Sequence, residues 1–390
     1  MSEASSIVAL LRDLVAVPSR GGVDDYMPVI GVVERWLASS GIAARRLTNA
    51  EGQVVALVAT FGPVAAPSHL ALNATLDTAG FGDIGRWSVP PTSAETRDGW
   101  LYGRGAADSK AGVAIFCHLA RDLLAERQRM TGALTLLFDV DEHTGGFAGV
   151  RQYIADTPAA ARPTAVYIGY PGNDRIVVGS RGFERAVIVV SGRAAHSGAS
   201  RERGSNAVLR AARLAEQLTA LALPARDAAS FPLPPQVTIT AMHGGDGFSM
   251  VPDACALNLD VRLTTTFDAP RARETIAAAV AAFDAASPDE LSTQVEWSAG
   301  WPAFRIADDH PAVRALVAAA TATFGRRIDA AVAGPSNVGN YFATLGIPAV
   351  SGFGVTYRSI HAPDECMELA SIDPVYQAYR QALRGLVGIA

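Results

Sequence analysis

Residues 98–112 read DGWLYGRGAADSKAG, and residues 141–146 read DEHTGG. The first stretch runs into a helical pattern over 110–126, and the second directly follows an apolar, strand-like run over 133–140. Both stretches therefore place acidic, basic and imidazole side chains next to regular elements. In open α/β sheets the loops at strand ends are where functional sites form.

Two further polar stretches occupy similar positions. TLDT at 75–78 follows the apolar run 69–74, and SIHAPDE at 359–365 lies downstream of the apolar run 347–353. Taken singly, each stretch has an ordinary structural explanation, such as a helix cap or a solvated loop. Because all four combine potential metal ligands with strand ends, we expect them to meet at one site.

Segments of helical and strand-like character alternate around these stretches. Helical periodicity covers 6–15, 29–39, 110–126 and 311–324, and apolar strand-like runs cover 54–60, 69–74, 133–140, 164–168 and 347–353. This alternation predicts an α/β domain with a mostly parallel sheet covered by helices.

The pattern changes near residue 180. A strand over 186–191, a helix over 206–221, strands over 236–242 and 254–263, a helix over 270–283 and a strand over 294–297 follow one another. This order is typical of a small ferredoxin-like α+β domain. We therefore predict a discontinuous catalytic domain, residues 1–179 plus 298–390, with an inserted domain at 180–297.

Composition excludes several classes of partner. The net charge is −5 without blocks of like charge, so neither nucleic acid nor an anionic membrane is expected as a partner. The three cysteines lack CxxC spacing, which fits a reducing cytoplasm. The N-terminal residues show no signal-peptide pattern, and no apolar run reaches the ~18 residues that span a bilayer. We expect a soluble cytoplasmic protein.

Six stretches together resemble one known family. They are LDT at 76–78, DGWLYGRGAADSKAG at 98–112, DEHTGG at 141–146, GRAAHSGAS at 192–200, MVPDACALNLDVRL at 250–263 and HAPDE at 361–365. The family is that of the zinc metallopeptidases and amidohydrolases, which includes aminoacylase, carboxypeptidase G and succinyl-diaminopimelate desuccinylase. The resemblance implies a zinc-exopeptidase-like catalytic domain and an inserted lid domain that forms a homodimer, and larger assemblies stay open.

The resemblance also assigns roles to individual residues. Asp108 matches the bridging metal ligand, His361 matches a terminal metal ligand, and Glu142 matches the general base and proton shuttle. His196 matches a lid histidine that reaches the active site of the partner subunit and polarises the scissile carbonyl. Asp77 matches an acidic residue that orients a ligand histidine.

This chain departs from the family pattern at other positions. Thr75 stands where the family has a histidine ligand, and His143 stands where it has a second glutamate. Tyr170 replaces an acidic residue before a proline, and Ser249 replaces a lid asparagine. The residues that usually hold one of two metals are thus largely lost.

These departures predict a mononuclear site. Asp108, His143 and His361 offer one carboxylate and two imidazoles, a set that suits Mn(II), Zn(II), Co(II) or Fe(II). The other position offers Thr75, Asp108 and Tyr170, and neutral hydroxyl groups are poor metal ligands. We expect one divalent transition metal.

Several residues are candidates for contact with substrate: Thr75, Tyr170, Ser249 and Arg262. Tyr170 either stacks on or hydrogen-bonds to a ring-shaped substrate, or fills the volume of the lost metal. Asp77, without its usual histidine, is left to hold Thr75, a water or the nitrogen of the substrate. Arg262 is a candidate clamp for a carboxylate group.

The leading functional hypothesis is a metal-dependent hydrolase that cuts a C–N bond in a small, carboxylate-bearing molecule, with Glu142 as general base. One alternative is an aromatic aminohydrolase that deaminates an aminobenzoate such as 5-nitroanthranilate. A second alternative is a catalytically inactive homologue that acts as a binding protein. The joint presence of Asp108, Glu142, His196 and His361 favours an enzyme.

Overall fold

The computed structural model describes residues 3–201, 203–226, 231–287 and 291–389. The chain forms two compact units. Unit 1 comprises Met1–Gly179, Ile306–Ala331 and Asn337–Ala390, and unit 2 comprises Ser180–Arg305 and Val332–Ser336. The sequence patterns placed the return to the first domain at residue 298, whereas the chain rejoins unit 1 at Ile306 and visits unit 2 once more.

A six-stranded sheet forms the centre of unit 1. Its order is β1 (Arg45–Thr48), β2 (Val54–Phe61), β6 (Ala133–Asp139), β3 (His69–Thr75), β7 (Ala165–Ile168) and β17 (Ala349–Val350). The pairs from β6 to β17 are parallel, and β1 and β2 are antiparallel additions at one edge. Strands β3, β6 and β7 are buried along their whole length, as expected for parallel strands covered on both faces. The predicted α/β class is confirmed.

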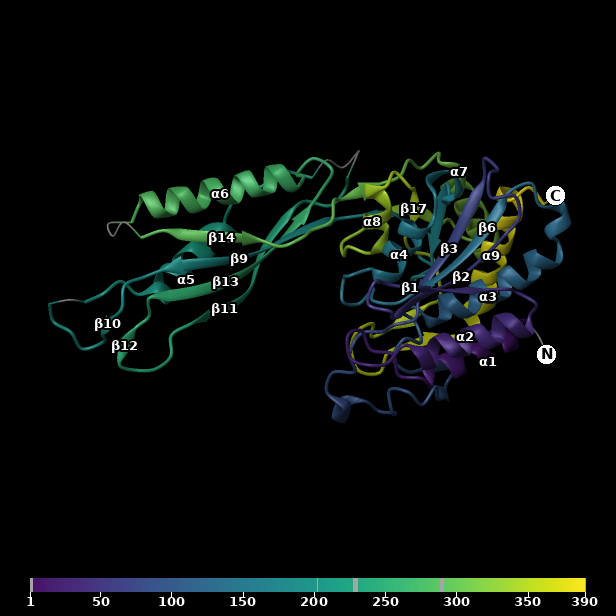
Figure 1. Cartoon of the computed structure of the whole chain (residues 1–390), viewed down its shortest axis with the longest axis horizontal. Coiled ribbons are helices and arrows are strands. Elements are labelled where there is room, and N and C mark those ends of the chain that lie inside the picture. Colours follow the sequence, from purple (N-terminus) through teal and green to yellow (C-terminus); the bar gives the residue numbers. More distant parts are fainter. Residues whose placement is uncertain (1–2, 202, 227–230, 288–290, 390) are drawn as a thin grey trace. The chain divides into compact units, whose positions relative to one another are not determined.

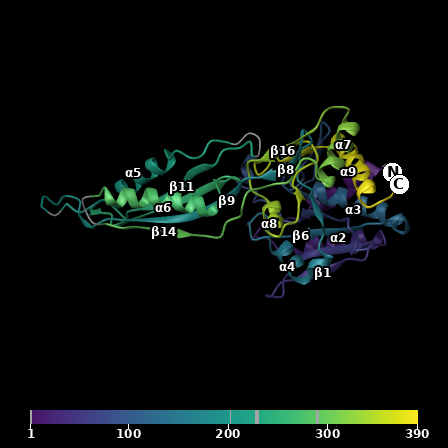
Figure 2. The same cartoon turned by 90° about the horizontal axis from the view of Figure 1, so that it is seen from above.

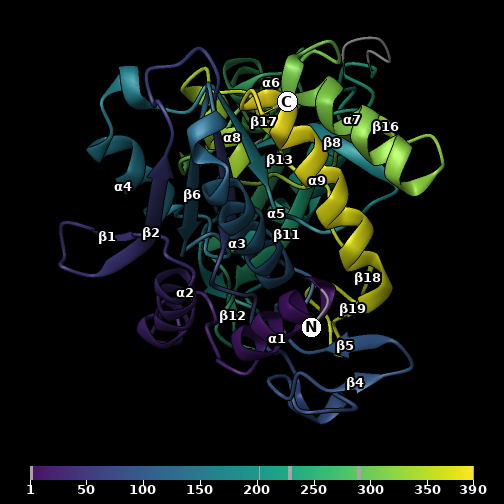
Figure 3. The same cartoon turned by 90° about the vertical axis from the view of Figure 1, so that its right-hand side faces the viewer.

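Helices cover both faces of this sheet. On one face α3 (Lys110–Ala125) packs against β3 and β6, and on the other α4 (Ala148–Asp156) packs against β2 and β6 (Figure 3). The remaining helices of the unit are α1 (Glu3–Val15), α2 (Met27–Ser39), α7 (Pro311–Phe324), α8 (Val338–Thr344) and α9 (Ile372–Leu386). Helix α9 contacts both α3 and α7 and so extends the helical layer on the α3 side.

Short strands complete unit 1 and the crossings between the units. A second, four-stranded sheet has the order β18 (Tyr357–Arg358), β19 (Cys366–Glu368), β5 (Trp100–Tyr102) and β4 (Thr96–Arg97). Strands β8 (Arg175–Ser180), β15 (Phe304–Arg305) and β16 (Asp329–Ala333) lie where the chain passes from one unit to the other.

Unit 2 has the predicted ferredoxin-like order of elements. These are β9 (Gly182–Ser191), α5 (Ala207–Thr219), β11 (Gln236–Gly244), β13 (Ala254–Leu263), α6 (Ala269–Ala285) and β14 (Thr293–Trp297). The antiparallel sheet has the order β11-β13-β9-β14, and α5 and α6 lie along it (Figures 1 and 2). Alternate residues of β9 and β13, such as Ile188 and Leu257, form a core with both helices. The other face of the sheet carries polar and charged side chains such as Arg185, Asn258 and Asp260, together with the exposed Val187.

Some elements differ from the sequence patterns. The apolar run 347–353 forms only the two-residue strand β17, because the chain then leaves β7 and pairs with β8. The Ser351 amide donates to Val177 O and the Val177 amide donates to Gly352 O, both at 2.8 Å. Helices α4, α8 and α9 were not predicted. The apolar residues of α9 recur at helical spacing and were a signal by which this helix could have been found. Among the described residues, no helix is long and apolar enough to cross a lipid bilayer.

Helix α3 approaches the sheet at a point where both segments have a glycine, Gly112 in α3 and Gly169 after β7. A Cβ atom added to Gly112 would lie 2.3 Å from the carbonyl oxygen of Gly169, which directly follows β7. Such a distance is far inside van der Waals contact, so only glycine allows this approach. The contact matters for the site because α3 begins two residues after Asp108 and Gly169 precedes Tyr170.

We predict that Gly112→Ala destabilises the protein by roughly 1–3 kcal/mol, because the added methyl group must push helix and strand apart. Gly385→Ala in α9 is the matched control, since an added Cβ there meets no atom within 4 Å. That substitution should raise stability by about 0.5–1 kcal/mol through helix propensity. Urea unfolding of both variants measures the difference, and equal effects would show that the backbones do not touch.

Asp139, the last residue of β6, is buried beneath the site with a relative exposure of 1 %. Its Oδ1 accepts a hydrogen bond from Asn73 Nδ2 at 2.8 Å, and within the described part of the chain its Oδ2 has no hydrogen-bond partner. Burial raises the pKa of Asp139 well above its ordinary range, and the nearby Asp77 carboxylate raises it further. The folded protein therefore keeps a proton that the unfolded chain releases above pH ~4.

This difference in bound protons predicts a pH-dependent stability effect for Asp139→Asn. Since the folded state binds more protons, the stability of the wild type falls as pH rises above ~4, by about 1.4 kcal/mol per pH unit until the raised pKa is reached. Asparagine cannot ionise, so the variant should become increasingly more stable than the wild type between pH 5 and pH 8. Urea unfolding in EDTA at both pH values measures this, and a difference that shrinks at pH 8 would contradict it.

Candidate metal centre

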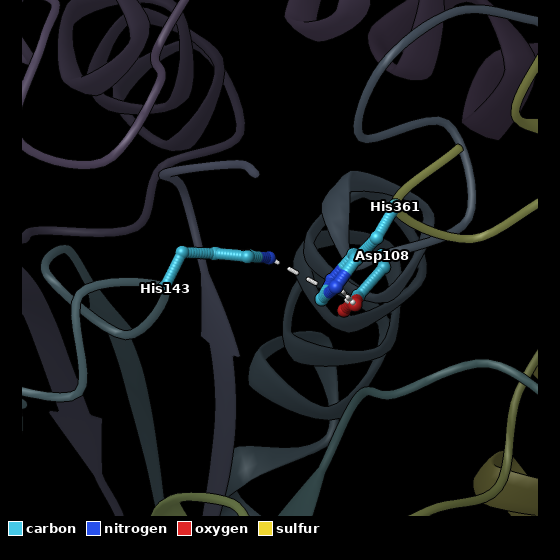
Figure 4. A group of neighbouring side chains, drawn as sticks. All are labelled: Asp108, His143 and His361. Carbon is cyan, nitrogen blue, oxygen red and sulfur yellow. Dashed lines mark hydrogen bonds and ion pairs between the residues drawn. The ribbon is translucent and has the colours of Figure 1, made fainter. Parts of the chain in front are cut away.

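Three potential metal ligands from distant segments converge in unit 1. Asp108 precedes α3, His143 follows β6, and His361 lies between β18 and β19. One donor atom from each side chain can be chosen so that all three lie within 4.8 Å of one another. His361 Nε2 is 3.1 Å and His143 Nε2 is 3.8 Å from Asp108 Oδ2. Figure 4 shows His143 approaching Asp108 and His361 from the opposite side.

The state of these donor atoms fits a divalent cation. Asp108 Oδ1 and His143 Nε2 are buried and have no hydrogen-bond partner among residues 3–201, 203–226, 231–287 and 291–389. Buried polar atoms without a partner are costly, and a bound cation would satisfy both at once. One carboxylate and two imidazoles are donors that Zn(II), Mn(II), Co(II) and Fe(II) accept. The His361 side chain is 55 % exposed, so one side of the cluster is open to solvent.

The charges around the cluster are strongly coupled. Burial alone would raise the pKa of Asp108, but His143 and His361 hold that pKa below its usual range. Burial alone would lower the pKa of His143, but the carboxylates of Asp108 and Asp77 raise it to about 11. The surrounding carboxylates therefore favour a proton on the His143 imidazole. The same field attracts a cation.

Asp77, directly after β3, organises the turn that carries Glu142 and His143. It is fully buried, and its two oxygens accept the backbone amides of Glu142 at 3.1 Å and of His143 at 3.0 Å. The Thr75 hydroxyl donates to Oδ1 of the same carboxylate. His143 Nδ1 lies 3.3 Å from Asp77 Oδ2, an arrangement that leaves Nε2 to face Asp108. Of the roles left open for Asp77, holding Thr75 is the one seen here.

Glu142 lies beside the cluster, with one oxygen held by Tyr170. The Tyr170 hydroxyl donates to Glu142 Oε1 at 2.6 Å, and Glu142 Oε2 is 3.4 Å from His143 Nδ1. Burial raises the pKa of Glu142 to about 7, while the neighbouring His143 charge and the Tyr170 hydroxyl lower it. Burial also raises the pKa of Tyr170 well above its usual range, so the phenol stays neutral and donates.

Sequence reasoning missed the ion pair that joins the Asp108 and His361 loops. Arg104 Nη1 donates to Glu365 Oε2 at 2.6 Å, and both side chains are buried. Glu365 Oε1 accepts the backbone amides of Gly105, Ala107 and Asp108 at 3.1–3.2 Å. Both residues lie within the stretches GRGAADSK and HAPDE, where two opposite charges with no assigned role were the available signal.

The remaining candidates lie in unit 2. His196 on β10 (Ala195–His196) pairs with Met250 on β12 (Met250–Val251), and Ser249 directly precedes that strand. His196 Nδ1 accepts a hydrogen bond from the Gly198 amide at 3.0 Å, which assigns the proton of the neutral imidazole to Nε2. Arg262 lines a cavity of about 760 Å³ on the helix-free face of the sheet, together with Arg181, Arg185 and Asp260. Asp260 Oδ1 pairs with Arg262 Nε at 2.7 Å.

Comparison with known proteins identifies relatives along the whole chain. The model of a family described as Peptidase family M20/M25/M40 matches residues 71–385. A succinyl-diaminopimelate desuccinylase of Bradyrhizobium sp. (strain BTAi1) is 26% identical over 392 residues, which cover 96% of this chain and 98% of that protein. The family predicted from the six stretches is confirmed.

Solved structures share the fold. An M20 family metallo-carboxypeptidase, Sso-CP2 from Sulfolobus solfataricus, superimposes with a TM-score of 0.78 and 18% identity, covering 100% of this chain and 99% of that one. The YXEP protein of Bacillus subtilis, described as a dinuclear metal binding peptidase from the M20 family, has a TM-score of 0.70 at 15% identity, covering 100% and 99%.

Proposed function

This chain belongs to peptidase family M20/M25/M40, whose members are metal-dependent hydrolases of amide and other C–N bonds, and we propose that it cleaves such a bond in a small, carboxylate-bearing molecule. Asp108, His143 and His361 hold a single divalent metal, and Glu142 is the general base. One observation carries the proposal: the Glu142 carboxylate lies against the three-residue cluster, with Oε2 3.4 Å from His143.

A divalent cation held by Asp108, His143 and His361 would supply Lewis acidity, which makes water acidic enough to attack near neutral pH and polarises an acceptor oxygen of the substrate. Glu142 accepts the proton of the attacking water and hands it to the departing nitrogen. General acid–base help of this kind contributes about 10²–10⁴-fold. Asp77 orients His143 and fixes the backbone of Glu142, so ligand and base keep their mutual geometry.

Two hydroxyl groups support a mononuclear site. The second metal position of the family would here be formed by Thr75, Asp108 and Tyr170. The Thr75 hydroxyl donates its proton to Asp77, and the Tyr170 hydroxyl donates to Glu142. Both groups are neutral donors already engaged with carboxylates, so they supply no anionic ligand to a second cation.

The cavity in unit 2 supports a carboxylate-bearing substrate. Arg262 lines it together with Arg181, and threonine and glutamine side chains of β11 add neutral hydrogen-bonding groups. Since Asp260 pairs with Arg262 Nε at 2.7 Å, a substrate carboxylate would replace Asp260 as its partner. Arginine binds carboxylates through two parallel hydrogen bonds. One relative is named succinyl-diaminopimelate desuccinylase, and we propose that a carboxylate-bearing substrate binds with its carboxylate at Arg262.

We assign His196 and Ser249 to the partner subunit's active site in a homodimer formed through unit 2. With Nδ1 occupied by the Gly198 amide, His196 presents an Nε2–H donor to a substrate oxygen. The exposed position of His196 on the short β10–β12 strand pair suits a role away from its own subunit. Ser249 O accepts the Ser197 amide at 2.9 Å and so continues the pairing of β10 with β12.

The alternatives differ in what they require of the site. An aromatic aminohydrolase requires the ring of its substrate next to the base. The Tyr170 hydroxyl is already bound to Glu142 and is therefore not available to hydrogen-bond such a ring. A binding protein requires neither a base nor an ordered shell around it, whereas Asp77, Tyr170 and Glu365 hold the catalytic loops by hydrogen bonds. We therefore favour hydrolysis of an amide.

The first test combines metal content with turnover. Purified protein loaded with Mn(II), Co(II) or Zn(II) should hold about one metal per chain and hydrolyse a member of a panel of N-succinyl and N-acetyl amino acids, dipeptides and aminobenzoates. Glu142→Gln should keep the metal but lose at least about 10²-fold in kcat. Glu95→Gln, at an exposed pair with Arg97, is the control and should behave as wild type. Full activity of Glu142→Gln would refute the base.

The metal count has its own check. In the double variant Thr75→His and Tyr170→Asp, two ligand side chains replace the two hydroxyls, and we expect the metal content to rise from about one toward about two per chain. Elemental analysis after dialysis measures both proteins side by side. Two equivalents in the wild type would overturn the mononuclear assignment and leave the C–N hydrolase assignment intact.

The homodimer is tested by mixing inactive parents. A dimer of one His196→Ala chain and one Glu142→Gln chain contains one complete site, built from Glu142 of the first and His196 of the second. Statistical reassembly makes half of the dimers mixed, so about a quarter of wild-type activity should return. The unmixed parents are the controls. If mixing restores nothing although both chains coassemble, His196 does not act across the dimer.

A further inference from the structure

We infer that Tyr170 is the positioning residue of the general base: its hydroxyl holds Oε1 of Glu142 and leaves Oε2 to take the proton. The hydroxyl lies 2.6 Å from Oε1, while Oε2 lies toward His143 at 3.4 Å. The inference rests on the proposed role of Glu142. It goes further by giving the two oxygens different tasks and by naming the group that separates them.

The backbone beneath Tyr170 is fixed on both sides. The Gly169 amide donates to Asn73 O of β3 at 2.8 Å, and the Gly172 amide donates to Val355 O at 2.8 Å. A Cβ atom added to Gly354 would lie 2.4 Å from the Tyr170 carbonyl oxygen, so the chain is also closely covered there. A phenol on such a support reaches Glu142 in a defined direction.

Glu142 needs this support because the turn that carries it fixes only its backbone. Its amide is held by Asp77 Oδ1 at 3.1 Å, and its carbonyl oxygen accepts the Gly145 amide at 2.8 Å. The side chain still has three rotatable bonds beyond Cα. A charge-assisted hydrogen bond to one carboxylate oxygen removes most of this freedom, which is what a general base requires to meet its proton.

The Tyr170 hydroxyl also stabilises the buried Glu142 carboxylate, as a nearby cation would. The site contains the carboxylates of Asp77, Asp108 and Glu142 close together, and each needs donors or positive charge. Asp77 has two amides and the Thr75 hydroxyl, and Asp108 has two imidazoles. Tyr170 supplies the donor for Glu142. A ring that only filled space would not need its hydroxyl.

Tyr170→Phe isolates the hydroxyl, since it keeps the ring. We expect kcat to fall about 10- to 100-fold, the loss that matches one hydrogen bond to a charged group, with KM changed less than about twofold. The probe is the panel member with the highest kcat/KM for the wild type, and Mn(II) content is measured in parallel and should stay at about one per chain. Tyr357→Phe, at a 43 % exposed tyrosine, is the matched control and should behave as wild type.

A second background tests whether Tyr170 acts through Glu142. Aspartate at position 142 is too short to reach the phenol, so Tyr170→Phe added to Glu142→Asp should lower its residual kcat no further. A kcat of Tyr170→Phe within twofold of wild type, a loss of Mn(II), or an additive loss in the double variant would each overturn the inference. If Glu142→Gln were itself active, the proposed function would fail instead.

A crystal structure of Mn(II)-loaded Tyr170→Phe tests the geometry without any substrate. Without the hydroxyl, the Glu142 carboxylate should rotate away from its wild-type position, while Asp108, His143 and His361 stay in place. A carboxylate that remains where it is in the wild type would show that Tyr170 does not position it.

Discussion

The buried ion pair between Arg104 and Glu365 is the interaction on which the site depends. Both side chains are almost inaccessible to solvent, at 2 % and 0 %, and removing either partner would leave an uncompensated charge at a cost of about 3–5 kcal/mol. The second oxygen of Glu365 holds the amides around Asp108. Asp108 and His361, 253 residues apart in the chain, are thereby brought to one place by a single carboxylate.

Asp77 holds the third segment of the site, the turn after β6, in the same way. Its carboxylate binds backbone amides of the turn that carries Glu142 and His143, just as Glu365 binds amides of the Asp108 loop. Loop backbone at a sheet edge lacks partners of its own, and a buried carboxylate can accept several amides at once. Buried acidic residues here therefore order the loops, and the residues they order face the metal centre.

The sequence predicted the helices and strands more accurately than the contacts between side chains. The helix expected over 110–126 is Lys110–Ala125, and the strand expected over 254–263 is Ala254–Leu263, because periodicity reports directly which face is buried. The meeting of Asp108, His143 and His361 followed from strand ends and from the resemblance. The contacts of Tyr170 with Glu142 and of Arg104 with Glu365 did not, since residue type cannot tell which of several nearby charges a donor will reach.

The carboxylates of Asp77 and Glu142 explain why hydroxyl residues stand at positions 75 and 170. A site that lost a cation without other change would leave Glu142 and Asp77 as buried carboxylates without positive charge, which is unstable. In this chain both have gained a hydroxyl donor, from Tyr170 and Thr75, at the positions where the family pattern has ligands. Random decay has no reason to satisfy both carboxylates together. The substitutions therefore form a coherent rearrangement that keeps Glu142 paired and in place, as the proposed mononuclear hydrolase requires.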